Sequence, residues 1–396
     1  MNEEIVRIAA KGDGVTETGR HVSGAVPGDI LLEDGALERG AHYVDPPCQH
    51  FSRCGGCQLQ QADEDALRDF VTQRVLGALE GQGLEPVEVL PTHLSPPHSR
   101  RRATLHAMRT HKGAVIGFRE AGSHTIVDLR ECLVLRKELT EQIQPLRGLI
   151  SKCAGKGAVD IGMALCDQGV DLSLTNVALD NLEATEATLD YAREHQLARL
   201  SIDQGFGPET VWEPEPVTIS MPGLPVAMPV GAFLQATCDA EDVMIADARE
   251  WLDGASPVAD LFAGLGTFTF GLTKGRKVLA VEAERATHLA CKNAAGRTGG
   301  RAFAIHRDLF RNPLQPEELN KFGGVLLDPP RAGAKAQIAQ IAASTVANVV
   351  YVSCNPSSWA RDAAKLIEAG FRLQKLRPVG QFRWSTHVEL TSQFTR

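Results

Sequence analysis

The C-terminal part of the chain, from Gln235 onward, alternates short apolar runs with longer amphipathic stretches. Short runs rich in Val, Ile and Leu are typical of parallel strands that are buried on both faces. The amphipathic stretches between them predict helices, one over 239–252 and another beginning near Thr267. This alternation predicts a doubly wound α/β sheet. Its strands are expected at 258–262, 277–282, 302–305, 324–327 and 346–352.

The part before Gln235 follows other patterns. Short apolar alternations in the first forty residues are broken by turn signals such as Pro27-Gly28-Asp29, which predict a small β-structure. Residues 62–81 carry apolar side chains at helical spacing. A strand-rich stretch then begins after Pro96-Pro97, with strands expected at 114–118 and 125–129, and continues as mixed α/β to Ile202.

A run of prolines between Pro214 and Pro229 marks the last expected domain boundary. We therefore predict three domains, at 1–43, 44–217 and 218–396. A chain of 396 residues with 43% hydrophobic content is long enough to form a buried core in each of three domains.

The compartment is predicted from what the sequence lacks. No apolar run approaches the ~20 residues of a membrane span, and the start Met-Asn-Glu-Glu has neither the basic nor the apolar region of a secretory signal. We expect a cytoplasmic protein, whose nine cysteines are thiols, metal ligands or nucleophiles rather than disulfides.

The net charge of −8 argues against a protein that coats nucleic acid indiscriminately. The cations are nevertheless clustered, because Arg100, Arg101 and Arg102 are followed closely by Arg109, Lys112 and Arg119. Such a cluster can contact several phosphates of RNA, or it can be the solvated face of a strand. The sequence leaves both readings open.

Ligands of an open parallel sheet bind at the carboxyl ends of its strands. The glycine loop 263–267 lies at such an end but lacks the spacing of dinucleotide folds and the Lys-Ser/Thr of a P-loop. Glu282 ends the next strand, where a carboxylate can accept both ribose hydroxyls, and Asp308 follows the third strand, where it could meet an adenine amine. This order resembles the class I S-adenosylmethionine-dependent methyltransferases, and an unrelated Rossmann-like binder is the alternative.

Two further strand ends carry candidate chemistry. Asp328-Pro329-Pro330-Arg331 forms a stiff loop suited to holding a planar base. Cys354 follows an apolar strand and precedes Asn355-Pro356, which places a thiol rigidly beside an open loop. Taken alone, Cys354 is more often a packing residue than a nucleophile.

Four cysteines form a candidate metal site. Cys48, Cys54 and Cys57 lie within ten residues around a Gly-Gly pair, and Cys132 is the best fourth ligand because Cys153 and Cys166 lie in stretches typical of ordinary core. One tight pair with a distant fourth thiol favours a [4Fe-4S] cluster over structural zinc, which usually takes two such pairs. The spacing also differs from that of radical S-adenosylmethionine enzymes, so we read the cluster as a structural or RNA-positioning element.

Together these motifs resemble the RNA uracil-C5 methyltransferases, specifically their iron-sulfur 23S ribosomal RNA branch. The resemblance spans nearly the whole chain and includes a TRAM-like start, Phe233-Leu234-Gln235 and His387-Val388-Glu389. The chain departs from the family in its glycine loop, where Ala263 and Thr267 replace Cys and Asn, in a shortened TRAM-like segment, and in His98-Ser99 where the family has Tyr.

The resemblance implies a fold and a reaction. The fold is a Rossmann-like class I methyltransferase domain, preceded by a mixed α/β RNA-binding domain with an iron-sulfur cluster and by the β-rich TRAM-like segment. Cys354 would add to C6 of uracil so that C5 can accept a methyl group, and Glu389 would then remove the C5 proton. Asp328 would orient the base, and His387 receives no chemical role.

The implied partners are S-adenosylmethionine and 23S ribosomal RNA. The site equivalent to nucleotide 1939 is preferred to that equivalent to 747 because of the TRAM-like segment. Arg100 to Arg102 would bind RNA, and no obligate protein partner is implied, so we expect a monomer. The residues implied to hold S-adenosylmethionine are Gln235, Phe262, Gly264, Gly266, Thr267, Glu282, Asp308 and Asp328.

Two other classes of function remain open. An amino-group methyltransferase can also use an acid-Pro-Pro loop but needs no thiol. A non-catalytic iron-sulfur RNA-binding protein would need neither the thiol nor the methyl donor.

Overall fold

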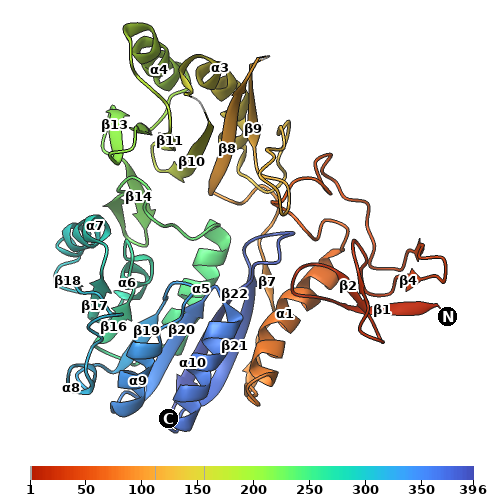
Figure 1. Ribbon diagram of the computed structural model, residues 1–396. Coiled ribbons are helices and arrows are strands. Elements are labelled where there is room, and N and C mark those ends of the chain that lie inside the picture. Colours follow the sequence, from red (N-terminus) through yellow and green to blue (C-terminus); the bar gives the residue numbers. More distant parts are fainter. Residues whose placement is uncertain (1, 112, 156) are drawn as a thin grey trace.

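The computed structural model describes residues 2–111, 113–155 and 157–396. Lys112, one of the clustered cations, lies outside the described residues. The described chain forms an N-terminal sheet, a central sheet with helices, a two-stranded ribbon and a large C-terminal sheet (Figure 1). No helix among these residues is long and apolar enough to cross a membrane.

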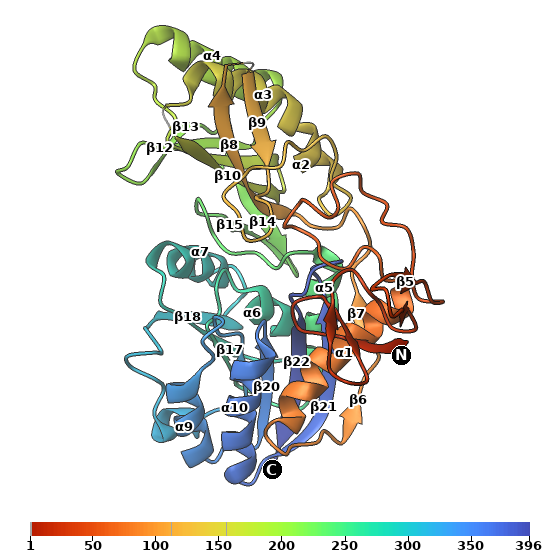
Figure 2. The ribbon, with the colours of Figure 1, turned by 45° about the vertical axis from the view of Figure 1, so that its right-hand side comes forward.

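The N-terminal sheet is the small β-structure that the turn signals predict. Its turn at Pro27-Gly28-Asp29 places Gly28 at a φ of 85°, which favours glycine. The buried carboxylate of Asp29 then accepts hydrogen bonds from the backbone N–H of Val26 and Gly40. The sheet lies to one side of the molecule, beyond α1 (Figures 1 and 2). Its strands, in spatial order, are β3 (His21–Val22), β2 (Gly14–Thr16), β1 (Glu3–Ile8), β4 (Ile30–Leu31) and β5 (Leu37–Glu38).

The predicted helix over 62–81 is α1 (Glu64–Glu80), and Asp63 caps its N-terminus. Its apolar face packs on α10 (Pro356–Glu368) and on β21 (Arg372–Gly380). Two short strands that follow, β6 (Glu88–Val89) and β7 (His93–Leu94), pair with β21. Residues 64–94 therefore pack with the C-terminal sheet, although they precede the central sheet in sequence.

The central sheet carries helices on one face. α3 (Ile143–Cys153) packs on β8 and β9, and α2 (Lys137–Glu141) and α4 (Leu182–Glu194) lie beside it. The strand expected at 125–129 is wrong. That segment makes an isolated bridge between Ile126 and Arg119, and its backbone donates from Val127 N to Phe118 O and from Leu129 N to Ile116 O. It lies so close to Gly117 that a Cβ there would be 2.0 Å from Val127 O. The strand order is β13 (Pro208–Trp212), β12 (Arg199–Asp203), β11 (Gly169–Thr175), β10 (Ala158–Cys166), β8 (Arg102–Thr110) and β9 (Gly113–Gly117).

The C-terminal sheet confirms the doubly wound prediction. Its first five strands are parallel, and β22 (Glu389–Thr395) enters antiparallel to β20. The parallel strands, in spatial order, are β18 (Ala302–His306), β17 (Val278–Glu282), β16 (Val258–Leu261), β19 (Gly324–Leu327) and β20 (Asn348–Ser353), followed by β22, β21 and β6.

Helices cover both faces of this sheet. One face packs on α1, α10, α9 (Lys335–Ala343) and the short α8 (Pro316–Leu319). The other packs on α5 (Cys238–Trp251), α6 (Thr267–Leu272) and α7 (Arg285–Ala295). The ribbon of β14 (Thr218–Met221) and β15 (Leu224–Ala227) connects this sheet to the central one (Figure 2). The carboxyl ends of the parallel strands therefore face the central sheet.

Candidate active site

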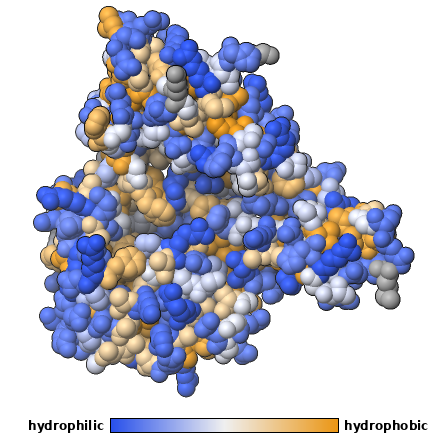
Figure 3. Space-filling view, viewed as in Figure 1, coloured by the Kyte–Doolittle hydropathy of each residue, from blue (hydrophilic) through white to orange (hydrophobic). Residues whose placement is uncertain are grey.

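The strand ends open into a cavity of about 770 Å³. Its walls come from the loops after β16, β17, β19 and β20, from the segment before α5 and from the start of β22. The surface is hollowed between the central and C-terminal parts, where apolar and polar side chains meet (Figure 3). Most of the predicted site residues line this cavity, namely Gln235, Phe262, Gly264, Thr267, Glu282, Asp328, Cys354 and Glu389.

The glycine loop leaves β16 through a sharp turn. Phe262 has a φ of 63°, a conformation that non-glycine residues rarely adopt and that recurs at ligand sites. Gly266, which is absent from the cavity wall, has a φ of 98°, and a Cβ there would lie 2.4 Å from the ring of Phe270. Gly266 is thus required by packing of the loop against α6, whereas Gly264 lies in the cavity wall itself.

Glu282 is held by backbone donors. Its Oε2 accepts a hydrogen bond from Gly264 N at 2.9 Å, and its Oε1 accepts from Ala283 N at 2.8 Å and Glu284 N at 2.7 Å. A carboxylate fixed in this way presents its remaining lone pairs in one direction. It faces the cavity, as expected of a group that binds hydroxyls.

Asp308 follows β18 as predicted, but its carboxylate is bonded within the turn after that strand. Its carboxylate accepts from Phe310 N at 2.9 Å and pairs with Arg311, and it is absent from the cavity wall. Phe310 lines the cavity instead and packs against Phe262, with 5.4 Å between ring centroids. The sequence reasoning missed Phe310, although an apolar aromatic four residues beyond the end of β18 was the available signal.

Asp260 lies beneath the glycine loop, fully buried. Its Oδ2 accepts from the hydroxyl of Thr269 at 2.5 Å, while its Oδ1 has no hydrogen-bond partner among the described residues. Burial raises the pKa of Asp260 to about 7, and the charge of Glu282 adds to that rise. The glycine loop therefore lies above a buried carboxyl group whose pKa is well above its ordinary value.

Cys354, Asp328 and Glu389 approach one another from the ends of three strands. Cys354 follows β20, and the Asn355 side chain caps α10 directly after it. Burial raises the pKa of the Cys354 thiol to about 11, and the charges of Glu389 and Asp328 raise it further, whereas Arg331 lowers it. Arg331, which also lines the cavity, is thus the cation that favours the thiolate.

Glu389 is the first residue of β22 and only 4% exposed, so it is not a surface carboxylate. Burial raises its pKa to about 7, against a hydrogen bond from Gln381 and the charges of Arg102 and Arg331, which lower it. Burial, and then the charge of Glu389, hold the pKa of Asp328 well above its ordinary value. A carboxyl group poised near pH 7 is suited to general base catalysis.

His387 stands outside this group. It packs edge-on against Phe382, with 5.8 Å between ring centroids, and is absent from the cavity wall.

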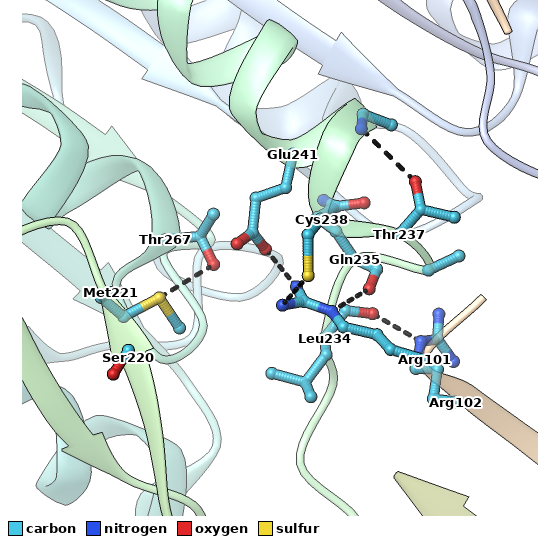
Figure 4. Close-up of polar contacts among 12 residues, drawn as sticks. Arg101, Arg102, Ser220, Met221, Leu234, Gln235, Thr237, Cys238, Glu241 and Thr267 are labelled. Atoms are coloured by element: carbon cyan, nitrogen blue, oxygen red, sulfur yellow. Dashed lines mark hydrogen bonds and ion pairs between the residues drawn. The ribbon is translucent and has the colours of Figure 1, made fainter. Parts of the chain in front are cut away.

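Thr267 lines the cavity and donates a hydrogen bond to the sulfur of Met221 on β14 (Figure 4).

Of the three arginines that were expected to contact RNA, the structure buries Arg101 and leaves Arg100 and Arg102 partly exposed. Arg101, whose side chain is 5% exposed, pairs with Glu241 at 2.6 Å and donates to Gln235 O at 3.0 Å (Figure 4). Arg102 donates to Leu234 O and lies over the ring of Phe233.

Arg100 is also half-buried and lines the cavity of the four cysteines. These cations bind the segment before α5 and the cysteine loop, because a buried guanidinium needs partners. Removing the charge of Arg101 would leave Glu241 buried and unpaired and would disturb Gln235, so neutralising all three arginines together would not isolate RNA binding.

The four candidate cysteines lie together. Cys48, Cys54, Cys57 and Cys132 line one cavity with Arg100, beside the apolar side chains of Phe118 and Leu129 among others. Burial raises the pKa of Cys57 to about 12, and the neighbouring thiols raise it further. In the described parts of the chain, however, no group of three or more His, Cys, Asp or Glu has the arrangement that holds a metal ion. The structure brings the cysteines together without showing a cluster.

Comparison with known proteins agrees with this geometry. Residues 300–396 match the family described as tRNA (Uracil-5-)-methyltransferase. The chain is 48% identical to an uncharacterized RNA methyltransferase of Zymomonas mobilis, over the full length of both. It is 30% identical to the 23S rRNA (uracil(1939)-C(5))-methyltransferase RlmD of Pectobacterium atrosepticum, over 89% of this chain and 80% of the relative.

A solved structure has the same fold. The tRNA (uracil-54, C5)-methyltransferase of Pyrococcus abyssi, in complex with S-adenosyl-L-homocysteine, matches with a TM-score of 0.76 over the whole of both chains at 20% identity.

Proposed function

The chain belongs to the RNA uracil-C5 methyltransferases, and from that premise we propose that it methylates C5 of one uridine in 23S ribosomal RNA through a covalent adduct. The observation that carries this proposal is the meeting of Cys354, Asp328 and Glu389 in one cavity. The site equivalent to nucleotide 1939 is preferred, since the relative that is 30% identical carries that number in its name. The site equivalent to 747 or another RNA is the alternative.

The cavity fits S-adenosylmethionine by its chemistry. Glu282 offers fixed acceptor oxygens for ribose hydroxyls, and Phe262 with Phe310 offers an aromatic surface for a planar base. Asp328 and Glu389 line the cavity and, when ionised, favour a positive charge within it. When bound, S-adenosylmethionine supplies the methyl group from its sulfonium. Gly264 also lines the cavity. Asp308 accepts a hydrogen bond from Phe310 N and so holds Phe310 in its position.

The residues of the chain act in sequence on the uracil. C5 of uracil is too weak a nucleophile to be methylated directly, so the thiolate of Cys354 adds to C6 and makes C5 enolate-like. Arg331 favours the thiolate form. After methylation at C5, Glu389 accepts the C5 proton, the C5–C6 double bond re-forms and the C6–S bond breaks, which returns the thiolate.

Asp328 orients the uracil ring of the substrate. Its Oδ2 is held by the Gln235 amide at 3.0 Å, so the carboxyl group keeps one direction in the cavity. The target uridine must leave its stack to reach Cys354, which favours a loop of the RNA over a regular duplex.

The substrate is tested by labelled methyl transfer to purified 23S ribosomal RNA and to transfer RNA, followed by nucleoside analysis. We expect 5-methyluridine in 23S ribosomal RNA, and a fragment map that places it at one position. Label only in transfer RNA would overturn the substrate, and methylated adenine would overturn the reaction. A matched Cys354→Ala preparation controls for contaminating enzymes.

We also propose that Cys48, Cys54, Cys57 and Cys132 hold a [4Fe-4S] cluster. Their meeting around one cavity supports this, together with their spacing along the chain. Cysteines bind metal as thiolates. The positive charge of the bound iron would offset the cost of burying four negative thiolates. Arg100, in the same cavity wall, would offset part of the negative charge.

Anaerobically purified protein is expected to be brown and to contain about four irons per chain. Cys132→Ala should lose most of the iron, because only three ligands remain. The matched control is Cys153→Ala, since Cys153 is buried in the central core and does not line the cavity of the other four. Stoichiometric zinc without iron, after anaerobic reconstitution, would rule the cluster out.

A further inference from the structure

A side chain that the sequence gave no reason to single out lies between two carboxyl groups of the cavity, those of Glu389 and Asp328. Gln381 follows β21 and is only 1% exposed. Its Oε1 accepts from Ala236 N at 2.9 Å, and its Nε2 donates to Gln235 Oε1 at 3.1 Å. It also forms a side-chain hydrogen bond to Glu389. The carboxamide of Gln381 thus contacts both Glu389 and the segment before α5.

The directions of these hydrogen bonds are fixed from one end. A backbone N–H can only donate, so the atom of Gln381 that faces Ala236 N must be the oxygen. The NH₂ group of Gln381 therefore faces Gln235 Oε1, and the NH₂ group of Gln235 in turn faces Asp328 Oδ2 at 3.0 Å. Asp328 Oδ2 therefore accepts a hydrogen bond from Gln235. When Asp328 is protonated, its proton must lie on Oδ1.

The same segment is anchored from the opposite side by the central part of the chain. Arg101 donates from Nε to Gln235 O at 3.0 Å (Figure 4). The backbone N–H of Arg101 donates to Ala236 O at 2.9 Å. Gln235 is only 3% exposed, and hydrogen bonds made in such a poorly solvated place hold their geometry strongly. Residues 235–236 are therefore clamped between Arg101 and Gln381.

We propose that Gln381 is a positioning residue of this active site, which fixes Glu389 directly and Asp328 through Gln235. The roles of Glu389 and Asp328 rest on the proposed function, whereas the geometry does not. Both NH₂ hydrogens of Gln381 are used, one on Gln235 and one on Glu389, so no other natural side chain of this length replaces it. The hydrogen bond from Gln381 stabilises the carboxylate form of Glu389 more than its protonated form, because a charged oxygen is the stronger acceptor.

The ionisation of Glu389 is set by groups on several elements. Arg102 on β8 and Arg331 after β19 favour its carboxylate. The charge of Glu389 in turn raises the pKa of Asp328 at the end of β19 and of Cys354 after β20, so these two groups oppose it. Gln381 is the neutral group in this set, and its removal leaves the charges in place.

The direct test is the titration of Glu389 itself in the full chain. Protein is labelled with ¹³Cδ-glutamate, and the signal of Glu389 is identified by its loss in Glu389→Gln. Gln381→Met keeps the length of the side chain and removes its hydrogen bonds, so the Glu389 midpoint should rise by about one pH unit. Gln381→Glu should raise it further, because it adds a negative charge beside Glu389.

The matched control is Gln337→Met. Gln337 is equally buried, and among the described residues its carboxamide bonds only the backbone of Leu314, so the Glu389 midpoint should not move. A midpoint in Gln381→Met within about 0.2 pH unit of wild type would overturn the proposal. Thermal unfolding verifies each fold, and Gln381→Leu serves if the Met variant does not fold.

Methylation assays separate this proposal from the proposed function. As the base must be ionised, activity should rise with pH through the Glu389 midpoint, and this limb should move upward in Gln381→Met. A purely structural defect would lower activity equally at every pH. If the midpoint moves but the limb does not, Gln381 positions Glu389 and Glu389 is not the base. If the wild type methylates no RNA, the titration still decides the role of Gln381.

Discussion

Cys354→Ala is expected to lose methylation by at least about 10³-fold and to form no covalent protein–RNA species. The physical reason is that no other thiol of the described chain lines the cavity, so the bond to C6 cannot form. Cys354 is only half-buried, so its truncation leaves a small void and should cost little stability. Cofactor binding should therefore be unchanged.

The measurement combines labelled methyl transfer with denaturing gels of protein incubated with RNA. Cys153→Ala, which removes a thiol from the central core, should retain activity and adduct. Residual methylation by Cys354→Ala within tenfold of wild type would show that no covalent step is needed. It would also return the amino-group methyltransferases to consideration.

Glu389→Gln is expected to slow turnover by about 10²-fold or more and to accumulate a methylated covalent adduct. Addition of Cys354 and methylation of C5 precede the step that needs the base, so they continue. The C5 proton then stays in place, and the thiol cannot be eliminated. The adduct should be visible on denaturing gels and should carry the methyl label.

The pKa of Glu389 adds a second expectation. Because burial raises this pKa to about 7, a growing fraction of wild-type Glu389 is protonated as the pH falls below 7. Wild-type protein at pH 6 should therefore slow and accumulate the same adduct, while Glu389→Gln should lose this dependence. If Glu389→Gln binds RNA and cofactor yet turns over normally or forms no adduct, another carboxyl group is the base.

The interpretation of the basic cluster shows how a sequence reading can fail. Three adjacent arginines in an acidic chain are typical of a phosphate contact. Arg101, however, directly precedes β8 and is buried, and it pairs with Glu241 at a separation of 140 residues. A salt bridge between such distant residues leaves no pattern in the local sequence, so the buried role was visible only in the structure.

Asp308 and Phe310 show a related limit. The order of strand ends located the third loop correctly, because parallel strands place their loops at one edge. Which side chain of that loop enters the cavity depends on the turn, and here the Asp308 carboxylate is used to hold the turn itself. The aromatic side chain two residues later faces the cavity instead.

The sequence alone determined the doubly wound C-terminal sheet and the strand ends that carry Glu282, Asp328 and Cys354. Apolar runs fix parallel strands, and parallel strands bring their ends together whatever the remaining contacts are. Only the tertiary structure decided the burial of Glu389, the inward direction of Arg101 and the role of Gln381. These depend on hydrogen bonds between segments that are distant in sequence, and on the loss of water around them, which no local pattern records.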